Sequence, residues 1–349
     1  MRASSPWLIA AFTLASAAFT SAHAAAPQPS ATQAVMDALS KANEAVVGIK
    51  VTAAEGARSM ATLGAHRTGS GVVIGADGLI LTIGYLLLEA QQIEIITQDN
   101  KTLPAVPVAY DLATGFGLLR PLLPLRGLTP VTLGNLQDLK PGEPLMAATG
   151  ATSNGRDGDV SMTQLVSKRA FSGTWEYHLD TALFTSPPVT AGGGNHSGAP
   201  LFNQKGELLG IGSLLVMDAL GENRRHPGNM FVPTDLLKPI LAELQQTGMS
   251  RQSRRPWLGL TSSVEDGRVK IVRVSEDSPA EMAGLEAGDT VLAVDDTKVA
   301  TLESFYKTLW ARDAPDAPVK LTVQHGDQIK TIVLTPQDRM LTLKKPSSI

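Results

Sequence analysis

Few side chains in this 349-residue chain could carry covalent or metal chemistry. There is no cysteine, so disulfides, thiolate nucleophiles and zinc–thiolate sites are excluded. The six histidines include no i,i+4 pair and no His-Glu-x-x-His run, so we expect neither a metal site nor a cofactor. The composition therefore excludes thiol chemistry, and the histidine spacing gives no sign of a metal site.

The overall composition is that of a folded, exported chain of two domains. Hydrophobic residues make up 43% and charged residues 18%, which excludes a disordered chain, and the length suits two domains. A net charge of −3 argues against a nucleic-acid partner, because such proteins carry a basic face. The 32 glycines and 22 prolines predict many short strands joined by tight turns.

Residues 1–25 have the features of a cleaved secretory signal peptide. Arg2 supplies the positive charge, residues 7–18 form a short apolar run, and residues 22–24 read Ala-His-Ala. No later stretch has the roughly 18 apolar residues that a spanning helix needs, so we expect no stable membrane span. Export of a cysteine-free chain favours a periplasmic location.

The elements that must position any site are mainly strands. A helix is predicted over residues 31–44, and short strand signals then recur for about 200 residues, with Asp77-Gly78 as a typical hairpin turn. This pattern predicts a mainly β fold, an antiparallel barrel or sandwich. A helix predicted over residues 235–246 closes this first domain, residues 31–247.

Residues 248–256 are polar and carry Arg251, Arg254 and Arg255, which indicates a solvated linker or, alternatively, a basic patch. A second small domain follows over residues 257–336, with a C-terminal tail over 337–349. Ser278-Pro279-Ala280-Glu281 is typical of a capped helix start, and residues 302–310 have the spacing of an amphipathic helix.

Several segments resemble, in order, the HtrA/Deg family of periplasmic trypsin-like serine proteases. In the first domain these segments are residues 68–82, 111–119 and 195–201. In the second domain, residues 257–260, 278–285 and 288–289 resemble the PDZ domain that follows in that family. The resemblance implies a trypsin-like double antiparallel β-barrel followed by a small α+β PDZ domain.

The same resemblance implies a degenerate catalytic triad. Ser197 matches the nucleophile, but residues 82–85 read Thr-Ile-Gly-Tyr and place Tyr85 at the position of the triad histidine. Gly115 stands at the position of the triad aspartate and has no side chain. A phenol with a pKa near 10 is a very poor base at neutral pH, and an unactivated serine is a weak nucleophile.

The loop before Ser197 also departs from the family. The resemblance places Asn195 at the oxyanion-hole position, where the family has glycine. His66, His178 and His196 could in principle reach the cleft and replace the missing base, although ordinary solvated or locally bonded histidines explain them as well.

The PDZ-like segment, by contrast, keeps its binding loop. Successive backbone amides of Leu258, Gly259 and Leu260 would form a nest for the terminal carboxylate of a peptide. The peptide would add as a strand, with the helix over residues 302–310 as the other wall. We therefore expect polypeptides or peptide C-termini as ligands.

The leading hypothesis is thus a periplasmic pseudoprotease that binds peptides through its PDZ domain, as a scaffold or regulator of proteolysis. The alternative is an active serine endopeptidase that uses Ser197 with a non-standard base, and a purely structural envelope protein is a third possibility. The resemblance also permits a homotrimer or assembly with an active relative.

Overall fold

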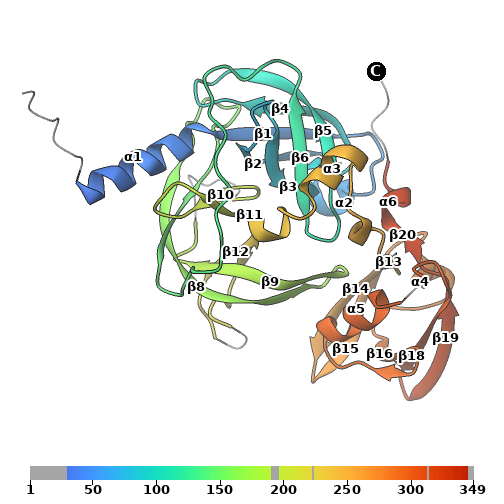
Figure 1. Ribbon diagram of the computed structural model, residues 1–349. Coiled ribbons are helices and arrows are strands. Elements are labelled where there is room, and N and C mark those ends of the chain that lie inside the picture. Colours follow the sequence, from blue (N-terminus) through green and yellow to red (C-terminus); the bar gives the residue numbers. More distant parts are fainter. Residues whose placement is uncertain (1–29, 190–195, 222–223, 313, 345–349) are drawn as a thin grey trace, which may run out of the picture.

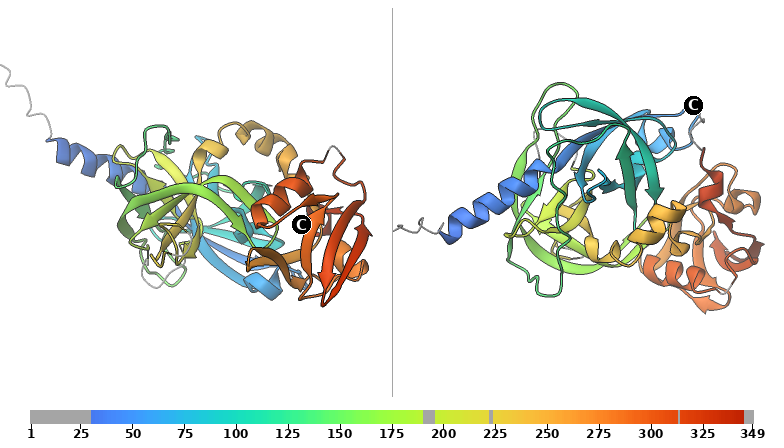
Figure 2. Two further views of the ribbon diagram at one scale, coloured as in Figure 1. Left: turned by 90° about the horizontal axis from the view of Figure 1, so that it is seen from below. Right: turned by 45° about the horizontal axis from the view of Figure 1, so that its top comes forward.

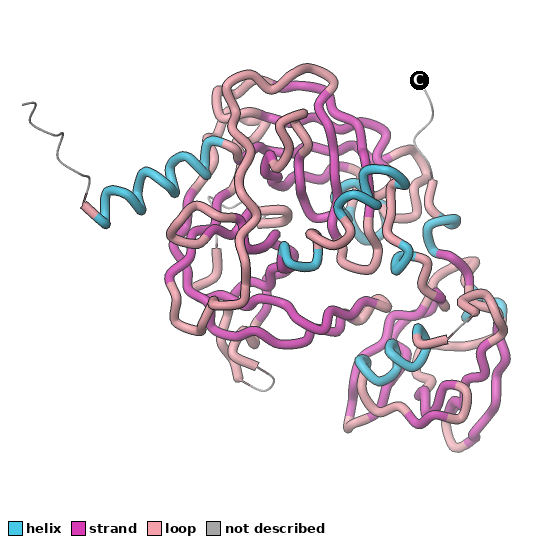
Figure 3. Tube along the Cα trace, viewed as in Figure 1, coloured by secondary structure: helices cyan, strands magenta, loops and turns pink. Residues whose placement is uncertain are grey.

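A computed structural model describes residues 30–189, 196–221, 224–312 and 314–344 of the chain. The fold is mostly β, with two closed barrels followed by a smaller mixed domain (Figures 1 and 3). Asn195 and the rest of residues 190–195 lie outside the described residues. None of the helices in the described ranges is long and apolar enough to cross a membrane.

Each barrel closes six antiparallel strands. The first has the order β1-β2-β3-β6-β5-β4, and the second β10-β11-β12-β9-β8-β7. The first barrel consists of β1 (Val46–Ala53), β2 (His66–Val73), β3 (Ile80–Ile83), β4 (Ala90–Ile96), β5 (Thr102–Tyr110) and β6 (Phe116–Pro121). The second consists of β7 (Pro144–Ala148), β8 (Val160–Gly173), β9 (Tyr177–Ser186), β10 (Pro200–Phe202), β11 (Leu208–Val216) and β12 (Gly228–Pro233). The sequence left a barrel or a sandwich open, and the structure is a pair of barrels.

The barrel interiors form the core that holds the site rigid. Apolar side chains from both barrels are buried in one cluster, among them Ile49, Leu81, Phe116 and Phe184. Their burial supplies most of the stabilisation of the fold, at roughly 25 cal/mol for each Å² of apolar surface removed from water. Short segments between these strands, such as the 3-10 turn η1 (Gly84–Leu87), therefore have a fixed base.

The helices are few and peripheral. The predicted first helix is confirmed as α1 (Ala31–Glu44), which projects from the barrels with mostly exposed side chains (Figures 1 and 2). A short α2 (Met60–Leu63) lies between β1 and β2.

The single helix expected over residues 235–246 is wrong. The segment instead divides into η3 (Thr234–Leu236) and α3 (Leu241–Thr247). Pro239 lies between them, and proline has no N–H to donate and disfavours the helical conformation of the residue before it.

Residues 248–256 are not simply a solvated linker. Arg251 and Arg254 are exposed, but Ser250 and Ser253 are buried, the latter within η4 (Arg251–Ser253). The Asp111 carboxylate explains this burial, because its Oδ1 accepts hydrogen bonds from the hydroxyls of Ser250 and Ser253, each at 2.5 Å. The segment is therefore anchored to the first barrel.

The C-terminal domain has its own core and its own sheet. The sheet has the order β14-β15-β16-β18-β19, with β17 paired to β16, so β14 is an edge strand. Its strands are β14 (Leu260–Glu265), β15 (Arg268–Val274), β16 (Thr290–Val294), β17 (Thr297–Lys298), β18 (Val319–His325) and β19 (Gln328–Leu334). The helices α4 (Pro279–Met282), α5 (Leu302–Trp310) and α6 (Arg339–Thr342) complete it, and β13 (Pro256–Trp257) pairs with β20 (Gln337–Asp338).

The β8–β9 hairpin joins the second barrel to this domain. Figure 1 shows the hairpin extending from the barrel toward α5 and β14. The hydroxyl of Tyr306 in α5 and the amide of Ser262 in β14 donate hydrogen bonds to carbonyl groups at its turn. The turn of this hairpin is thus part of the interface between the domains.

Candidate functional site

Tyr85 and Ser197 meet between the two barrels. Tyr85 comes from η1, which follows β3 of the first barrel, and Ser197 lies just before β10 of the second. The Tyr85 hydroxyl is 2.5 Å from the Ser197 Oγ and 2.9 Å from the carbonyl oxygen of Ser213. The structure therefore brings together two of the residues that the sequence singled out.

The Tyr85 phenol is not equipped to act as a base. Burial raises the pKa of Tyr85 to about 12, and the hydrogen bond with Ser197 offsets this only in part. With such a pKa only about one phenol in 10⁵ is ionised at pH 7. A hydroxyl carries a single proton, so Tyr85 donates either to Ser197 or to the Ser213 carbonyl at any moment. In both orientations Ser197 faces a neutral phenol.

Gly115 has a backbone conformation that an aspartate would adopt only under strain. Its φ is +82°, in the left-handed region that favours glycine. A Cβ added at Gly115 would lie 3.0 Å from the hydroxyl of Tyr177, which is already hydrogen-bonded to the carbonyl of Thr114 at 2.6 Å. Tyr177 thus fills the space into which a side chain at this position would extend.

Ser197 itself is held tightly by its surroundings. Its carbonyl accepts a hydrogen bond from the Ser70 amide at 2.9 Å. The next residue, Gly198, has a φ of +77°, and a Cβ there would meet the Ser70 carbonyl at 2.0 Å. Only glycine fits this close approach of the two barrels. Asn195, the expected oxyanion-hole position, lies outside the described residues.

The neighbouring His196 has a side-chain hydrogen bond with the backbone of Leu214. Burial lowers the pKa of His196, against the opposing effect of a hydrogen bond to the backbone of Leu214. Its Nε2 is buried and has no hydrogen-bond partner among the residues that the structure describes.

His66 and His178 make local bonds elsewhere. His66 pairs with the hydroxyl of Thr52 at 3.5 Å on the first barrel. The Nδ1 of His178 lies 2.8 Å from the hydroxyl of Ser172 within the β8–β9 hairpin. Each of these two rings is therefore engaged by a neighbour on its own sheet.

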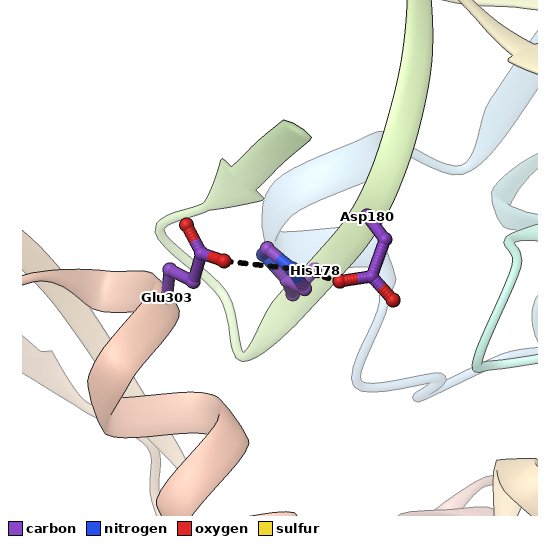
Figure 4. A group of neighbouring side chains, drawn as sticks. All are labelled: His178, Asp180 and Glu303. Atoms are coloured by element: carbon purple, nitrogen blue, oxygen red, sulfur yellow. Dashed lines mark hydrogen bonds and ion pairs between the residues drawn. The ribbon is translucent and has the colours of Figure 1, made fainter. Parts of the chain in front are cut away.

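His178 also belongs to a group of possible metal ligands with Asp180 and Glu303, drawn in Figure 4. The ammonium of Lys307 lies 2.6 Å from Asp180 and 2.7 Å from Glu303. A cation therefore already balances these two carboxylates, and we assign the group to the contact between β9 and α5.

The expected carboxylate nest has a carboxylate bound to it. The amide of Leu258 donates to Glu176 Oε1 at 3.1 Å, and the amide of Gly259 donates to Glu176 Oε2 at 3.4 Å. Desolvation raises the pKa of Glu176 to about 7, opposed by hydrogen bonds from these amides and that of Leu260 and by the charge of Arg339. The three residues that the sequence singled out thus converge on one acidic side chain.

Sequence reasoning missed Glu176 and Asp111. Glu176 lies in the turn of the β8–β9 hairpin, 82 residues before Leu258, and no local pattern marks it. Asp111 begins the segment over residues 111–119 that resembles the family, and its carboxylate accepts the amide and hydroxyl of Thr114, at 2.9 and 2.6 Å. The one available signal was the Asp-x-x-Thr spacing, which is typical of a local turn.

Comparison with known proteins defines the class. Residues 69–211 match the trypsin-like peptidase domain family, and residues 256–335 match the PDZ domain family. Both barrels and the C-terminal domain are therefore of known types. The chain belongs to the HtrA family, as a trypsin-like domain with a C-terminal PDZ domain.

The relatives of this chain that the comparison found are named as proteases. The serine protease HTRA1 of Xenopus tropicalis is 27% identical over 303 residues, covering 78% of this chain and 60% of that protein. A probable periplasmic serine endoprotease DegP-like protein of Halomonas elongata is 29% identical over 285 residues, covering 77% of this chain and 56% of that protein. The aligned part is thus less than two thirds of the length of these relatives.

Solved structures show the same fold. The HtrA-type protease AlgW with a tripeptide superimposes with a TM-score of 0.53 at 20% identity, covering 90% of this chain and 98% of that one. The serine endoprotease from Yersinia pestis gives a TM-score of 0.52 at 22% identity, covering 89% and 98%.

Proposed function

We propose that this chain is a non-proteolytic HtrA-family protein of the periplasm that binds polypeptides through their free C-termini. In this proposal the PDZ domain is the functional site and the barrels are its scaffold. The protein would act as an adaptor or regulator of proteolysis, as a homotrimer or together with an active relative.

The observation that carries the proposal is the hydrogen bond of 2.5 Å between Tyr85 and Ser197. Acyl transfer requires a group that accepts the serine proton, and the contribution of that general base is about 10²–10⁴ in rate. Tyr85 cannot make this contribution because its pKa is raised to about 12. Gly115 offers no carboxylate to orient or charge a base.

Peptide binding is supported by the carboxylate already bound at the nest. The amides of Leu258 and Gly259 hold Glu176 without any cationic side chain in the loop. A chain-terminal carboxylate offers the same two oxygens to these amides, and with its lower pKa it stays ionised at neutral pH. The AlgW structures contain bound peptides, which is consistent with such a ligand for this fold.

Labelling with a fluorophosphonate, a reagent for activated serine hydroxyls, tests the first half of the proposal. We expect the mature chain to label no faster than its Ser197→Ala variant and to leave unfolded casein intact, while trypsin serves as the positive control. Labelling or casein cleavage that disappears in Ser197→Ala would establish the alternative, an active endopeptidase with a non-standard base.

Matched peptides test the second half. We expect a peptide with an apolar last residue and a free carboxylate to bind, and the same peptide with an amidated C-terminus to bind much more weakly. Amidation removes the charge and one acceptor oxygen but leaves the strand-forming backbone intact. Equal affinity for the two peptides would contradict the carboxylate nest.

A further inference from the structure

The turn of the β8–β9 hairpin, residues 173–176, is hydrogen-bonded to both β14 and α5 of the PDZ domain. We refer to this turn as the hairpin tip and to the position between β14 and α5 as the groove. Since β14 is an edge strand, its free backbone groups can pair with an added strand. The amide of Ser262 in β14 donates to the carbonyl of Thr174 in the hairpin tip at 2.8 Å. The hairpin tip therefore uses the same edge that an incoming peptide strand would use.

On the other side of the groove, α5 binds the hairpin tip through the buried hydroxyl of Tyr306. Tyr306 of α5 donates to the carbonyl of Gly173 at 2.9 Å and accepts the amide of Glu176 at 3.2 Å. Two backbone groups of the turn are thus satisfied by a single side chain of α5, and the hairpin tip is bonded to both walls.

The carboxylate of Glu176 lies where the terminal carboxylate of a bound peptide is expected. Glu176 follows Thr174 by two residues, and its carboxylate accepts hydrogen bonds from the amides of Leu258 and Gly259, just before β14. Glu176 has a φ of +59°, a conformation that is uncommon for a residue with a side chain. The bonds of its amide and its carboxylate to the PDZ domain offset this strain.

We infer that the hairpin tip is an internal ligand of the PDZ groove, with the Glu176 carboxylate in the place of a peptide's terminal carboxylate. The inference rests on the proposed peptide-binding function. A peptide competes with Glu176 for the amides of Leu258 and Gly259 and with Thr174 for the edge of β14. Its observed affinity is therefore its intrinsic affinity multiplied by the fraction of chains in which the hairpin tip has left the groove.

Binding of one labelled peptide, and of the same peptide with an amidated C-terminus, to the full mature chain tests this competition. The peptide ends in an apolar residue with a free carboxylate, and the variants are Glu176→Ala and, as a control, Glu286→Ala, which removes an exposed carboxylate of the same domain. At pH 6.5 we expect Glu176→Ala to lower the dissociation constant by about tenfold or more. The control should bind like the wild type.

Two failures can be told apart in this experiment. Equal affinity of the wild type and Glu176→Ala for the free-carboxylate peptide would overturn the internal ligand and leave the proposed function intact. If all three proteins bound the free and amidated peptides equally, or bound neither, the proposed function would be contradicted.

Hydrogen exchange without any peptide tests the internal ligand directly. In Glu176→Ala the amides of residues 258–259 lose their acceptor, and we expect their exchange to be at least about tenfold faster than in the wild type. Unchanged exchange in β15 and β18 would show that the domain remains folded. Equal exchange of residues 258–259 in the two proteins would overturn the inference, whether or not a peptide binds.

Discussion

The hydroxyl of Tyr85 lies 2.5 Å from the Oγ of Ser197, and the same hydroxyl lies 2.9 Å from the carbonyl of Ser213. The phenol therefore connects the two barrels at the point where the family resemblance places an imidazole. A buried phenol preserves a hydrogen bond there but not proton transfer, because its pKa is raised to about 12.

The reactivity of Ser197 should stay at background from pH 6 to pH 10. A serine activated by histidine becomes more reactive as the imidazole loses its proton near pH 7, whereas Tyr85 remains neutral over this whole range. The measurement is the rate of fluorophosphonate labelling relative to Ser197→Ala, and Tyr85→Phe should give the same rate as the wild type. A labelling rate that rises with pH and needs the Tyr85 hydroxyl would contradict this assignment.

Restoring the two triad residues should not restore an ordinary protease. In Tyr85→His/Gly115→Asp, the new aspartate must adopt a φ near +82° and lie against the Tyr177 hydroxyl. Without a properly held orienting group the rate should remain at least about 10²-fold below that of an active HtrA protease. Casein turnover is the measurement, with the active protease as reference, and turnover equal to the reference would show that the site needs only these two side chains.

Asp111→Ala should destabilise the chain by about 3 kcal/mol, since it leaves several buried donors without their acceptor. These donors include the hydroxyls of Thr114, Ser250 and Ser253. Urea denaturation gives the free energy of unfolding. Asp327→Ala, at an exposed turn, is the control and should change it by less than about 0.5 kcal/mol. A similarly small loss in Asp111→Ala would refute a structural role for this carboxylate.

Peptide binding should strengthen as the pH rises from 5.5 to 8. Desolvation in the groove raises the pKa of Glu176 from 4.5 to about 7, so seating the hairpin tip takes up a proton. The seated state is therefore most stable below about pH 4.5 and loses stability as the pH rises toward 7. A peptide carboxylate, with a pKa near 3.5, stays ionised throughout. We expect the affinity to rise by about tenfold or more over this range.

The matched control for this pH dependence is Glu176→Gln, which keeps the size of the side chain and cannot titrate. The other groups facing Glu176 are Arg339 of α6 and Tyr306 of α5, and burial raises the pKa of Tyr306 above its usual value. Binding to Glu176→Gln should accordingly be independent of pH. If the variant showed the same pH dependence as the wild type, another group would be responsible.

Most element types and the class of fold can be predicted from local sequence patterns. Strand-length apolar runs separated by turn residues predict an antiparallel β protein, and the residues flanking Ser197 and Gly259 carry the family resemblance. The hydrophobic spacing over residues 235–246 predicts one helix, but Pro239 within this segment is a helix breaker, and the segment divides there. Tyr85 and Gly115 could be identified as replacements because each lies within a recognisable local run.

The partners of these residues depend on how distant segments pack together. Asp111 binds Ser250 across 139 residues, and Glu176 binds Leu258 across 82 residues. Such contacts join segments that are far apart in the sequence, where one polar side chain suffices and no periodicity is required. Local sequence therefore predicts a free carboxylate nest at Leu258 and Gly259, whereas the packing of the hairpin against the PDZ domain places the Glu176 carboxylate in it.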